Sequence, residues 1–488
     1  MIFLFATFQE VIILSKELVT KSVEELAPLL KNREISSLEL TQAVMDHAEK
    51  LDKEINAFIM MTRGRAEKAA RVADEEIKAG YYRGMYHGIP MAVKDNLYFK
   101  GEVTTMGSKI NQNFIPHYEA TVIQKLRHAG VIFTGKLSMH EYAAGVTNNN
   151  PHCGPCHNPW NTKMVPGGSS GGSGAAVAAD MTVASLGTDT AGSVRIPASA
   201  CGIVGLKPTY GRVSKYGCFP LSWSLDHIGP MTKTVKDAAG LLEIMEGYDP
   251  LDSTSLNVPT TGNYIERLTG DIEGLVIGVN EDYFFHHIDK EVETFVRKAL
   301  QMLEDRGAKV EVVSIPSLQY AEYAELVTII SEAATIHHRN LTKRADDYGD
   351  DVRLFFELGE LPSAVDFLEA QQLRRQIKKD FEQAFEKVDV IIAPTLPILP
   401  PEIGANKTTL NGKEVDVLDE MIRLTGPSNL TGLPSLSIPC GVAKDNLPVG
   451  MQVIGPALRE DLVLNVGYAY ELTNPMEGKR PNLLTEVE

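Results

Sequence analysis

Two short segments rich in glycine and serine contain the residues whose types and spacing could do chemistry. The first, 167–173 (GGSSGGS), comes directly before the alanine-rich stretch 175–179, which favours a helix. Such a loop presents unhindered backbone N–H groups at a helix N-terminus, where they can bind an oxyanion or a phosphate. A nucleotide-binding P-loop would end in Gly-Lys-Ser or Gly-Lys-Thr, whereas Gly174-Ala175-Ala176 follows here. On this segment alone, a catalytic loop, a nucleotide loop and a flexible linker all stay open.

The second segment, 188–195 (TDTAGSVR), places a serine after several small residues. It follows the apolar, strand-like residues 183–186. Small residues let backbone amides approach a reacting carbonyl group, so Ser193 could act as a nucleophile. The developing oxyanion would then be held by the backbone N–H groups of Thr190, Ala191, Gly192 and Ser193.

A serine nucleophile needs a base to take its proton. None of the 12 histidines lies in either segment, and the nearest one downstream is His227. It follows Asp226 directly, and neighbouring residues of a strand point to opposite faces, which disfavours a Ser-His-Asp triad there. Lysine can replace histidine when burial lowers its pKa, since desolvation disfavours the charged ammonium. Lys94, at the end of the apolar run 88–93, is the best placed lysine.

The elements that must position these residues alternate between strand-like and helical patterns. Strand-like runs at 88–93 and 131–134 enclose a helical pattern at 119–128, and this order predicts a mainly parallel sheet with helices on its faces. We also expect a helix from residue 138 onward. Further elements are expected at 275–279, 291–306, 309–313, 388–393, 436–439, 449–454 and 460–472. Residues 315–388 look helical, so we predict one α/β domain with a helical excursion there.

Composition and charge exclude several classes of protein. The chain has 488 residues, of which 43% are hydrophobic and 23% charged, so it is neither disordered nor a disulfide scaffold. The balance of 47 basic against 64 acidic residues leaves a net charge of −17, which disfavours unaided binding to nucleic acid. Five cysteines, an odd count, indicate a reducing compartment.

The first 14 residues are apolar but resemble neither a signal peptide nor a membrane span. They carry Gln9 and Glu10, lack a basic start, and have no small-residue cleavage site before Lys16. A membrane span needs about 20 apolar residues. We therefore expect a short N-terminal extension over 1–20 and a cytoplasmic protein without membrane contact.

Taken together, these motifs resemble the signature of the amidase signature family. The resemblance runs continuously through 165–173, 187–197 and 201–212. Matching motifs outside that block lie at 88–90, 93–96, 158–160, 224–226, 393–395 and 432–434. The resemblance implies a single α/β domain over 21–488, with a large mixed central β-sheet covered by helices on both faces. It also implies that the helical excursion at 315–388 shapes the substrate pocket.

The resemblance also implies a set of catalytic residues. Ser193 would be the nucleophile, Lys94 the base, and Ser169 a bridge between them, held by a cis peptide bond between Gly168 and Ser169. No metal and no cofactor take part. The residues expected to support this set are Ser170, Asp189 and Arg195. Ala191 stands where many members carry glycine, and this difference leaves the backbone N–H donor in place.

The reaction implied is hydrolysis of a linear carboxamide to a carboxylate and ammonia or an amine, with the amide and water as partners. Within the family, the A subunit of glutamyl-tRNA(Gln) amidotransferase hydrolyses glutamine and passes ammonia to a partner. That group carries an acidic residue seven positions before the Asn of a Pro-x-Asn motif. Here Pro427-Ser428-Asn429 places Ile422 there, while Glu420 lies two residues away. We favour a free-standing amidase over that alternative.

Three further hypotheses stay open from the sequence. A non-catalytic binding scaffold is disfavoured because Lys94, Ser169 and Ser193 are all present. Nucleic acid is expected as a partner only under the amidotransferase alternative, and a homodimer is compatible with the sequence. Cys153 and Cys156, flanked by histidines, could bind zinc or form a redox pair, but no second ligand pair is evident. We expect the segment with Cys153 and Cys156 to be a loop near the mouth of the active site instead.

Overall fold

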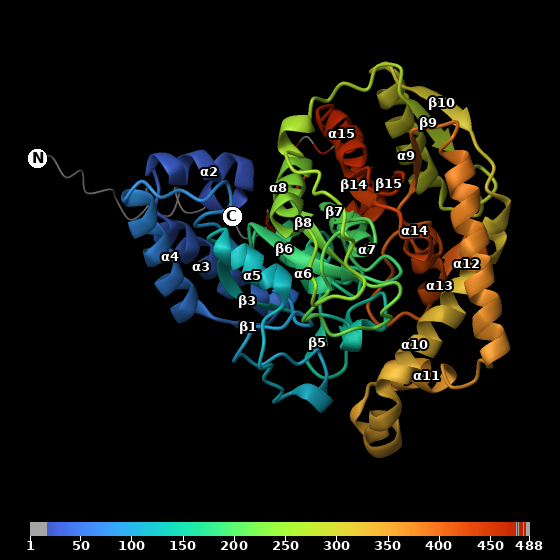
Figure 1. The fold of residues 1–488 in the computed structure, drawn as a ribbon, viewed down its shortest axis with the longest axis horizontal. Coiled ribbons are helices and arrows are strands. Elements are labelled where there is room, and N and C mark those ends of the chain that lie inside the picture. The colour runs from blue at the N-terminus through green and yellow to red at the C-terminus, as the bar shows by residue number, and fades with distance from the viewer. Residues whose placement is uncertain (1–16, 475, 477, 482, 485–488) are drawn as a thin grey trace, which may run out of the picture.

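The computed structural model describes residues 17–474, 476, 478–481, 483 and 484. The apolar start of the expected extension, 1–14, lies outside the described residues. Figure 1 shows α2 (Val23–Asn32), α3 (Ser37–Ile55) and α4 (Arg63–Lys78) at one end of the molecule. At the other end lie α9 (Lys290–Glu304), α10 (Ala321–Arg344), α11 (Asp350–Leu358) and α12 (Ala364–Ala384), with the central strands between the two groups.

An 11-stranded sheet runs through the molecule in the order β1-β3-β2-β6-β8-β7-β14-β15-β11-β9-β10. Its strands are β1 (Phe58–Met61), β2 (Pro90–Lys94), β3 (Ile132–Leu137), β6 (Ala184–Asp189), β7 (Val204–Lys207), β8 (His227–Thr232), β9 (Val276–Val279), β10 (Lys309–Val312), β11 (Val390–Pro394), β14 (Ser435–Val442) and β15 (Pro448–Ile454). Two short hairpins, β4 (Asn149–Asn150) with β5 (Gly154–Pro155) and β12 (Lys407–Leu410) with β13 (Lys413–Asp416), lie outside it.

The sheet is mixed, as the family resemblance implies, and not mainly parallel. Parallel pairs occur where a helix connects neighbouring strands, as between β2 and β3 and between β9 and β10. The central pairs are antiparallel: β6 with β8, β8 with β7, β7 with β14, and β14 with β15. The strand-helix-strand pattern therefore predicted the parallel pairs of β2 with β3 and of β9 with β10 correctly. It did not predict the centre of the sheet, where other connections join the strands, nor the outer pair of β1 with β3, which is also antiparallel.

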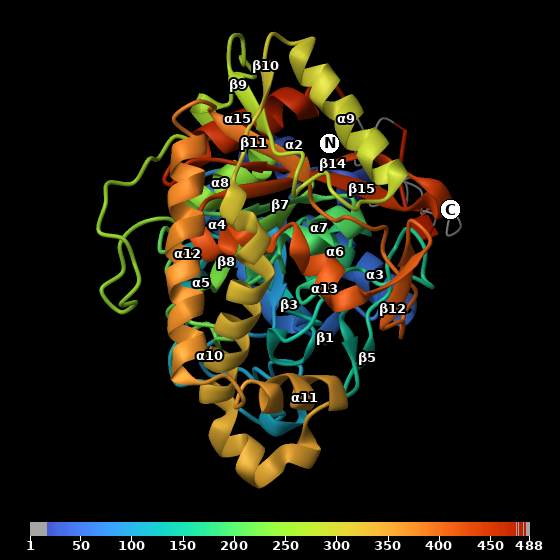
Figure 2. The same ribbon diagram turned by 90° about the vertical axis from the view of Figure 1, so that its right-hand side faces the viewer.

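Helices cover both faces of this sheet. The described helices are α2 (Val23–Asn32), α3 (Ser37–Ile55), α4 (Arg63–Lys78), α5 (Thr121–His128), α6 (Gly171–Ala178), α7 (Arg195–Cys201), α8 (Val235–Met245), α9 (Lys290–Glu304), α10 (Ala321–Arg344), α11 (Asp350–Leu358), α12 (Ala364–Ala384), α13 (Val417–Arg423), α14 (Gly426–Thr431) and α15 (Glu460–Glu471). Figure 2 shows α15 above β14 and β15, and α6 and α7 below them. The helix α8 packs on α15 and on β7 and β8. The helices α10 and α12 of the segment 315–388 pack on each other and on α14.

The helix expected from residue 138 does not form. Only a short 3₁₀ turn occurs there, at Glu141–Ala143, because Tyr142 (φ 52°) and Ala143 (φ 63°) adopt left-handed backbone conformations. A right-handed helix cannot form through residues in these conformations. The chain instead forms a loop that leads to one wall of a pocket described below.

Candidate active site

Lys94 is the last residue of β2 and is completely buried. Its Nζ donates hydrogen bonds to Ser169 Oγ (2.7 Å) and to Thr188 Oγ1 (2.8 Å). Burial lowers the pKa of Lys94 from 10.5 to about 7, although the charges of Asp189 and Asp226 oppose this shift. Near neutral pH a large fraction of the amine is therefore uncharged and holds a free lone pair.

Ser169 lies in the glycine-rich loop before α6 and is also completely buried. The peptide bond between Gly168 and Ser169 is cis. A Cβ atom on Gly168 would lie 2.8 Å from the carbonyl carbon of Val146, so the loop can approach this backbone only with glycine there. The next serine, Ser170, donates to the carbonyl oxygen of Thr188 and accepts from its N–H, which fixes the loop against β6.

Ser193 lies in the loop between β6 and α7, with 7% of its surface exposed. The structure brings Lys94 and Ser169 into direct hydrogen-bond contact. In the part of the chain that the structure describes, no hydrogen bond joins Ser193 to Ser169. Ser193 instead faces a pocket, with Thr190 and Ala191 beside it in the lining.

A buried ion pair fixes the backbone around Ser193. Asp189 accepts from Nε and Nη2 of Arg195, both at 3.0 Å, and from the N–H groups of Gly192 (2.8 Å) and Val194 (3.2 Å). Burial alone would raise the pKa of Asp189, but the charge and hydrogen bonds of Arg195 outweigh it and hold that pKa well below its usual range. The Gly192 N–H, expected in the oxyanion hole, is thus already bound to Asp189. Of the four N–H groups expected in the oxyanion hole, those of Thr190, Ala191 and Ser193 have no hydrogen-bond acceptor among the described residues.

Residues distant in the sequence complete the support of this loop. The hydroxyl of Thr425 donates to the carbonyl oxygen of Ala191 (2.5 Å), and Asn429 Nδ2 donates to Asp189 Oδ1 (2.9 Å). A Cβ atom on Gly192, whose φ is +130°, would lie 2.2 Å from Thr425 Oγ1. Glycine at 192 is therefore required both for the backbone conformation and for the contact with Thr425.

Asp226 supports the same loop from another direction. It accepts from Thr190 Oγ1 (2.6 Å) and from the N–H groups of Leu221 (3.0 Å) and Ser222 (3.1 Å). Burial raises the pKa of Asp226 to about 6. His227 does not form a triad with it, because its Nδ1 lies 2.6 Å from the carbonyl oxygen of Leu225 and its Nε2 lies 3.2 Å from Lys207 Nζ.

The pocket beside Ser193 is mostly apolar. Its other lining residues are Ala143, Ala144, Gly145, Val146, Leu221, Leu326, Ile329, Phe355, Leu418, Asp419 and Ile422. Leu326 and Ile329 come from α10 and Phe355 from α11, so three lining residues belong to the segment 315–388. Asp419 is the one charged residue of the lining, and none of the described residues pairs with its carboxylate.

The cysteine motif lies in the loop of β4 and β5. Cys153 and Cys156 are both free thiols, and burial raises the pKa of Cys153 to about 11. Among the described residues, no three side chains of His, Cys, Asp or Glu gather in an arrangement that could hold a metal ion.

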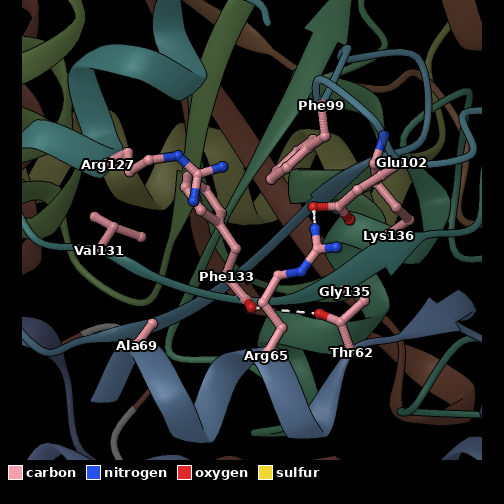
Figure 3. A pocket seen from close by; sticks show the side chains of 10 residues that line it. All are labelled: Thr62, Arg65, Ala69, Phe99, Glu102, Arg127, Val131, Phe133, Gly135 and Lys136. Atoms are coloured by element: carbon pink, nitrogen blue, oxygen red, sulfur yellow. Dashed lines mark hydrogen bonds and ion pairs between the residues drawn. The ribbon is translucent and has the colours of Figure 1, made fainter. Parts of the chain in front are cut away.

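A separate pocket lies beside β3 (Figure 3). The ion pair of Arg65 with Glu102 spans it. Arg127 lies 5.4 Å from the ring centroid of Phe133 and pairs with Glu119 at 2.6 Å. These opposite charges satisfy one another, so we assign no chemistry to this pocket.

Comparison with known proteins shows the family of this chain. A family model described as Amidase matches residues 39–464. The chain belongs to the amidase signature family. The A subunit of glutamyl-tRNA(Gln) amidotransferase from Cyanothece sp. is 42% identical, over 95% of this chain and 100% of the relative.

Two solved structures of this amidase family carry the comparison further. A crystal structure of an amidase is 33% identical, with a TM-score of 0.85 over 93% of this chain and 100% of that one. The crystal structure of the A subunit of glutamyl-tRNA(Gln) amidotransferase from Thermotoga maritima is 34% identical, with a TM-score of 0.79 over 94% of this chain and 96% of that one. Over the described residues of this family member, no helix is both long and apolar enough to cross a membrane.

Sequence reasoning missed several residues of this amidase-family site. The hydroxyl oxygen of Thr188 accepts hydrogen bonds from Nζ of Lys94 and from Nδ2 of Asn96 (3.1 Å). Thr188 belongs to the motif 187–197 and could have been named from the sequence. Its contact with Lys94, however, depends on the pairing of β2 with β6, which no local pattern indicates. Thr425 and Asn429 lie more than 200 positions away from the loop they support, and no local spacing links them to it.

We expect the Asp189–Arg195 pair to contribute strongly to stability. Arg195→Met would leave the carboxylate of Asp189 buried without its cation and would lower the free energy of unfolding by about 3–5 kcal/mol. Urea denaturation of both proteins measures this difference. Arg353→Met is a control, because its partner Glu357 is 45% exposed and such pairs contribute at most about 1 kcal/mol. Equal losses in the two variants would contradict the assignment.

Proposed function

We propose that this chain cleaves a carboxamide C–N bond through an acyl-enzyme on Ser193. The observation that carries the proposal is the buried contact of 2.7 Å between Lys94 Nζ and Ser169 Oγ. An uncharged amine in that position can accept a proton, which an exposed ammonium cannot do. The Ser193–Ser169 link is the part of the relay that the proposal adds.

In the proposed reaction, Ser193 Oγ bonds to the carbonyl carbon of the amide. Its proton passes to Ser169 Oγ while the proton of Ser169 passes to Nζ of Lys94. The N–H groups of Thr190, Ala191 and Ser193 stabilise the oxyanion. The C–N bond then breaks, and the proton returns through Ser169 to the leaving amine. Water afterwards attacks the ester on Ser193 by the same relay and releases the carboxylate.

The lining of the pocket favours a free-standing hydrolase as the first candidate. Leu326, Ile329, Phe355 and Ile422 would pack on an apolar acyl group, and burial of such a group stabilises the complex in proportion to its area.

The curated relatives favour the second candidate, in which the chain is the A subunit of a glutamyl-tRNA(Gln) amidotransferase. The Cyanothece sp. relative carries that name and is covered over its full length. This finding supports the amidotransferase alternative better than the free-standing hydrolase. The free-standing hydrolase was favoured from the sequence because Ile422 stands where the amidotransferase subunits carry an acidic residue. Under this second candidate, glutamine is the amide and the ammonia passes to a partner subunit.

One assay separates the two candidates. The purified chain is incubated alone, without ATP, with hexanamide, with an anilide or with glutamine, and the released ammonia or aniline is measured. A free-standing hydrolase releases product from hexanamide or the anilide. Turnover confined to glutamine and dependent on a second subunit supports the amidotransferase reading. Absence of product and of an acyl adduct, both for the chain alone and for the chain with a second subunit added, would reject both.

Asp419 provides an independent prediction for these candidates. Its unpaired carboxylate is the charged group of the lining, so it would attract the ammonium of glutamine but contribute nothing to a neutral apolar amide. For an ammonium-bearing substrate, we expect Asp419→Asn to lower kcat/KM by about tenfold or more, and for hexanamide by less than about twofold. Glu414→Gln is the control, since Glu414 pairs with Lys407 at the surface. Equal effects of Asp419→Asn on both substrates would contradict this role.

A further inference from the structure

A second cleft lies between α12, α14 and the turn after β7. It holds about 1100 Å³ of space, part of it open to solvent, and no residue lines both this cleft and the Ser193 pocket. Its lining includes three cationic side chains of α12, Arg374, Arg375 and Lys378, and no acidic side chain.

The cations lie on one flank of α12. Spacings of three and four residues place Arg374, Arg375 and Lys378 next to one another on a helix. Arg374 is fixed in the wall, because its guanidinium donates to the carbonyl oxygen of Leu430 (2.6 Å), to Ser224 Oγ (2.9 Å) and to the carbonyl oxygen of Ser224 (2.8 Å). The charge of buried Glu332 partly balances that of Arg374.

Arg375 and Lys378 are different, because both are exposed and neither has an ion-pair partner among the residues that the structure describes. Lys215 adds a further positive charge at the edge: its Nζ donates to Tyr210 OH (3.0 Å) and lies 4.2 Å from the centroid of that ring. Unpaired cations that converge on a cleft without carboxylates are unusual in a chain whose net charge is −17.

The remainder of the cleft is largely apolar. Leu256, Leu430 and Leu458 contribute to its lining, and Tyr210 adds an aromatic ring. We propose that this cleft binds a small organic anion. Its phosphate or carboxylate group pairs with Arg375 and Lys378, and its apolar body packs against Leu256 and Leu458. The inference is independent of the catalytic role proposed for Ser193.

A small ligand suits this cleft better than a nucleic acid. A phosphate backbone would meet the acidic surface of the rest of the chain, since acidic residues exceed basic ones by 64 to 47. A small anion meets only the cations of the cleft, and its apolar body gains contact that an inorganic ion cannot make.

The proposal is tested by isothermal titration calorimetry on the full chain with phenyl phosphate, benzoate and inorganic phosphate. We expect saturable binding of phenyl phosphate or benzoate that weakens as NaCl rises from 50 to 500 mM. The stronger of the two identifies the preferred anionic group, and inorganic phosphate binds more weakly than phenyl phosphate. The double variant Arg375→Gln/Lys378→Gln should lose about tenfold or more in affinity.

Lys379→Gln is the matched control, because Lys379 is exposed on the same helix but does not line the cleft. It should bind the aromatic anion as the unmodified chain does, and thermal melting should show all variants folded. Three results would overturn the proposal: no saturable binding of either aromatic anion, unchanged affinity in the double variant, or an equal loss in Lys379→Gln. Tighter binding of inorganic phosphate than of phenyl phosphate would also overturn it.

Discussion

We expect Ser193→Ala to abolish amide cleavage and to leave the fold intact. Removing Oγ removes the atom that forms the acyl bond, so we expect kcat/KM to fall on the order of 10⁴-fold or more. The loss of one hydroxyl from a residue that faces a pocket costs little packing, so the thermal midpoint should change only slightly. Steady-state kinetics on a substrate found in the amide panel measures the effect.

Ser173→Ala is the control for this variant. Ser173 lies in the same glycine-rich segment as Ser169, and its hydroxyl donates to the carbonyl oxygen of Leu186 (3.1 Å) rather than to the relay. It should keep most of the activity. Turnover by Ser193→Ala near that of the unmodified chain would show that another group is the nucleophile, and turnover lost equally in Ser173→Ala would show only a structural effect.

Lys94→Met is expected to have the second largest effect. Methionine fills a similar volume in the buried site but offers no lone pair, so Ser169 can no longer pass its proton to a base. We expect kcat/KM to fall roughly 10²- to 10⁴-fold, with a smaller change in KM, because the amine acts in the proton transfer and not in binding. Removing a buried amine whose pKa is lowered to about 7 should not destabilise the fold strongly, because the charged form is already disfavoured by burial.

Lys100→Met serves as the control for Lys94→Met. Lys100 is exposed near the same strand and makes no contact with the relay. Its substitution should leave kcat/KM within about twofold. If Lys94→Met retained full activity, the base would have to be sought elsewhere, with Asp226, whose pKa burial raises to about 6, as one candidate.

Local patterns predicted much of the fold and part of the site. The apolar run before Lys94 and the small residues before Ser193 predicted β2 and the loop after β6, since strands and tight loops leave marks within a few residues. The pairing of β6 with β8 joins segments about 40 residues apart and left no such mark, so the parallel interpretation was wrong for the centre of the sheet.

For the candidate site, the sequence predicted which residues belong to it but not how they are arranged. Lys94, Ser169 and Ser193 came from motifs, but the use of the Gly192 N–H by Asp189 depends on the exact turn of the loop. The pocket wall from α10 and α11 comes from tertiary packing and carries no sequence signature of its own. Residue types and spacing therefore predicted which residues are candidates for the chemistry, but not which acyl group the pocket accepts.

The most direct test of the central claim is the pH dependence of acylation. An activated ester or amide is mixed with the chain at pH 5 to 9, the reaction is quenched, and the acyl adduct is quantified by intact mass and located by peptide mapping. If the uncharged form of Lys94 is the base, as proposed, the acylation rate should rise with pH and reach half its maximum near pH 7, because burial lowers the pKa of this amine to about 7. The adduct should lie on Ser193. A rate independent of pH across this range, or an adduct on another residue, would contradict the account.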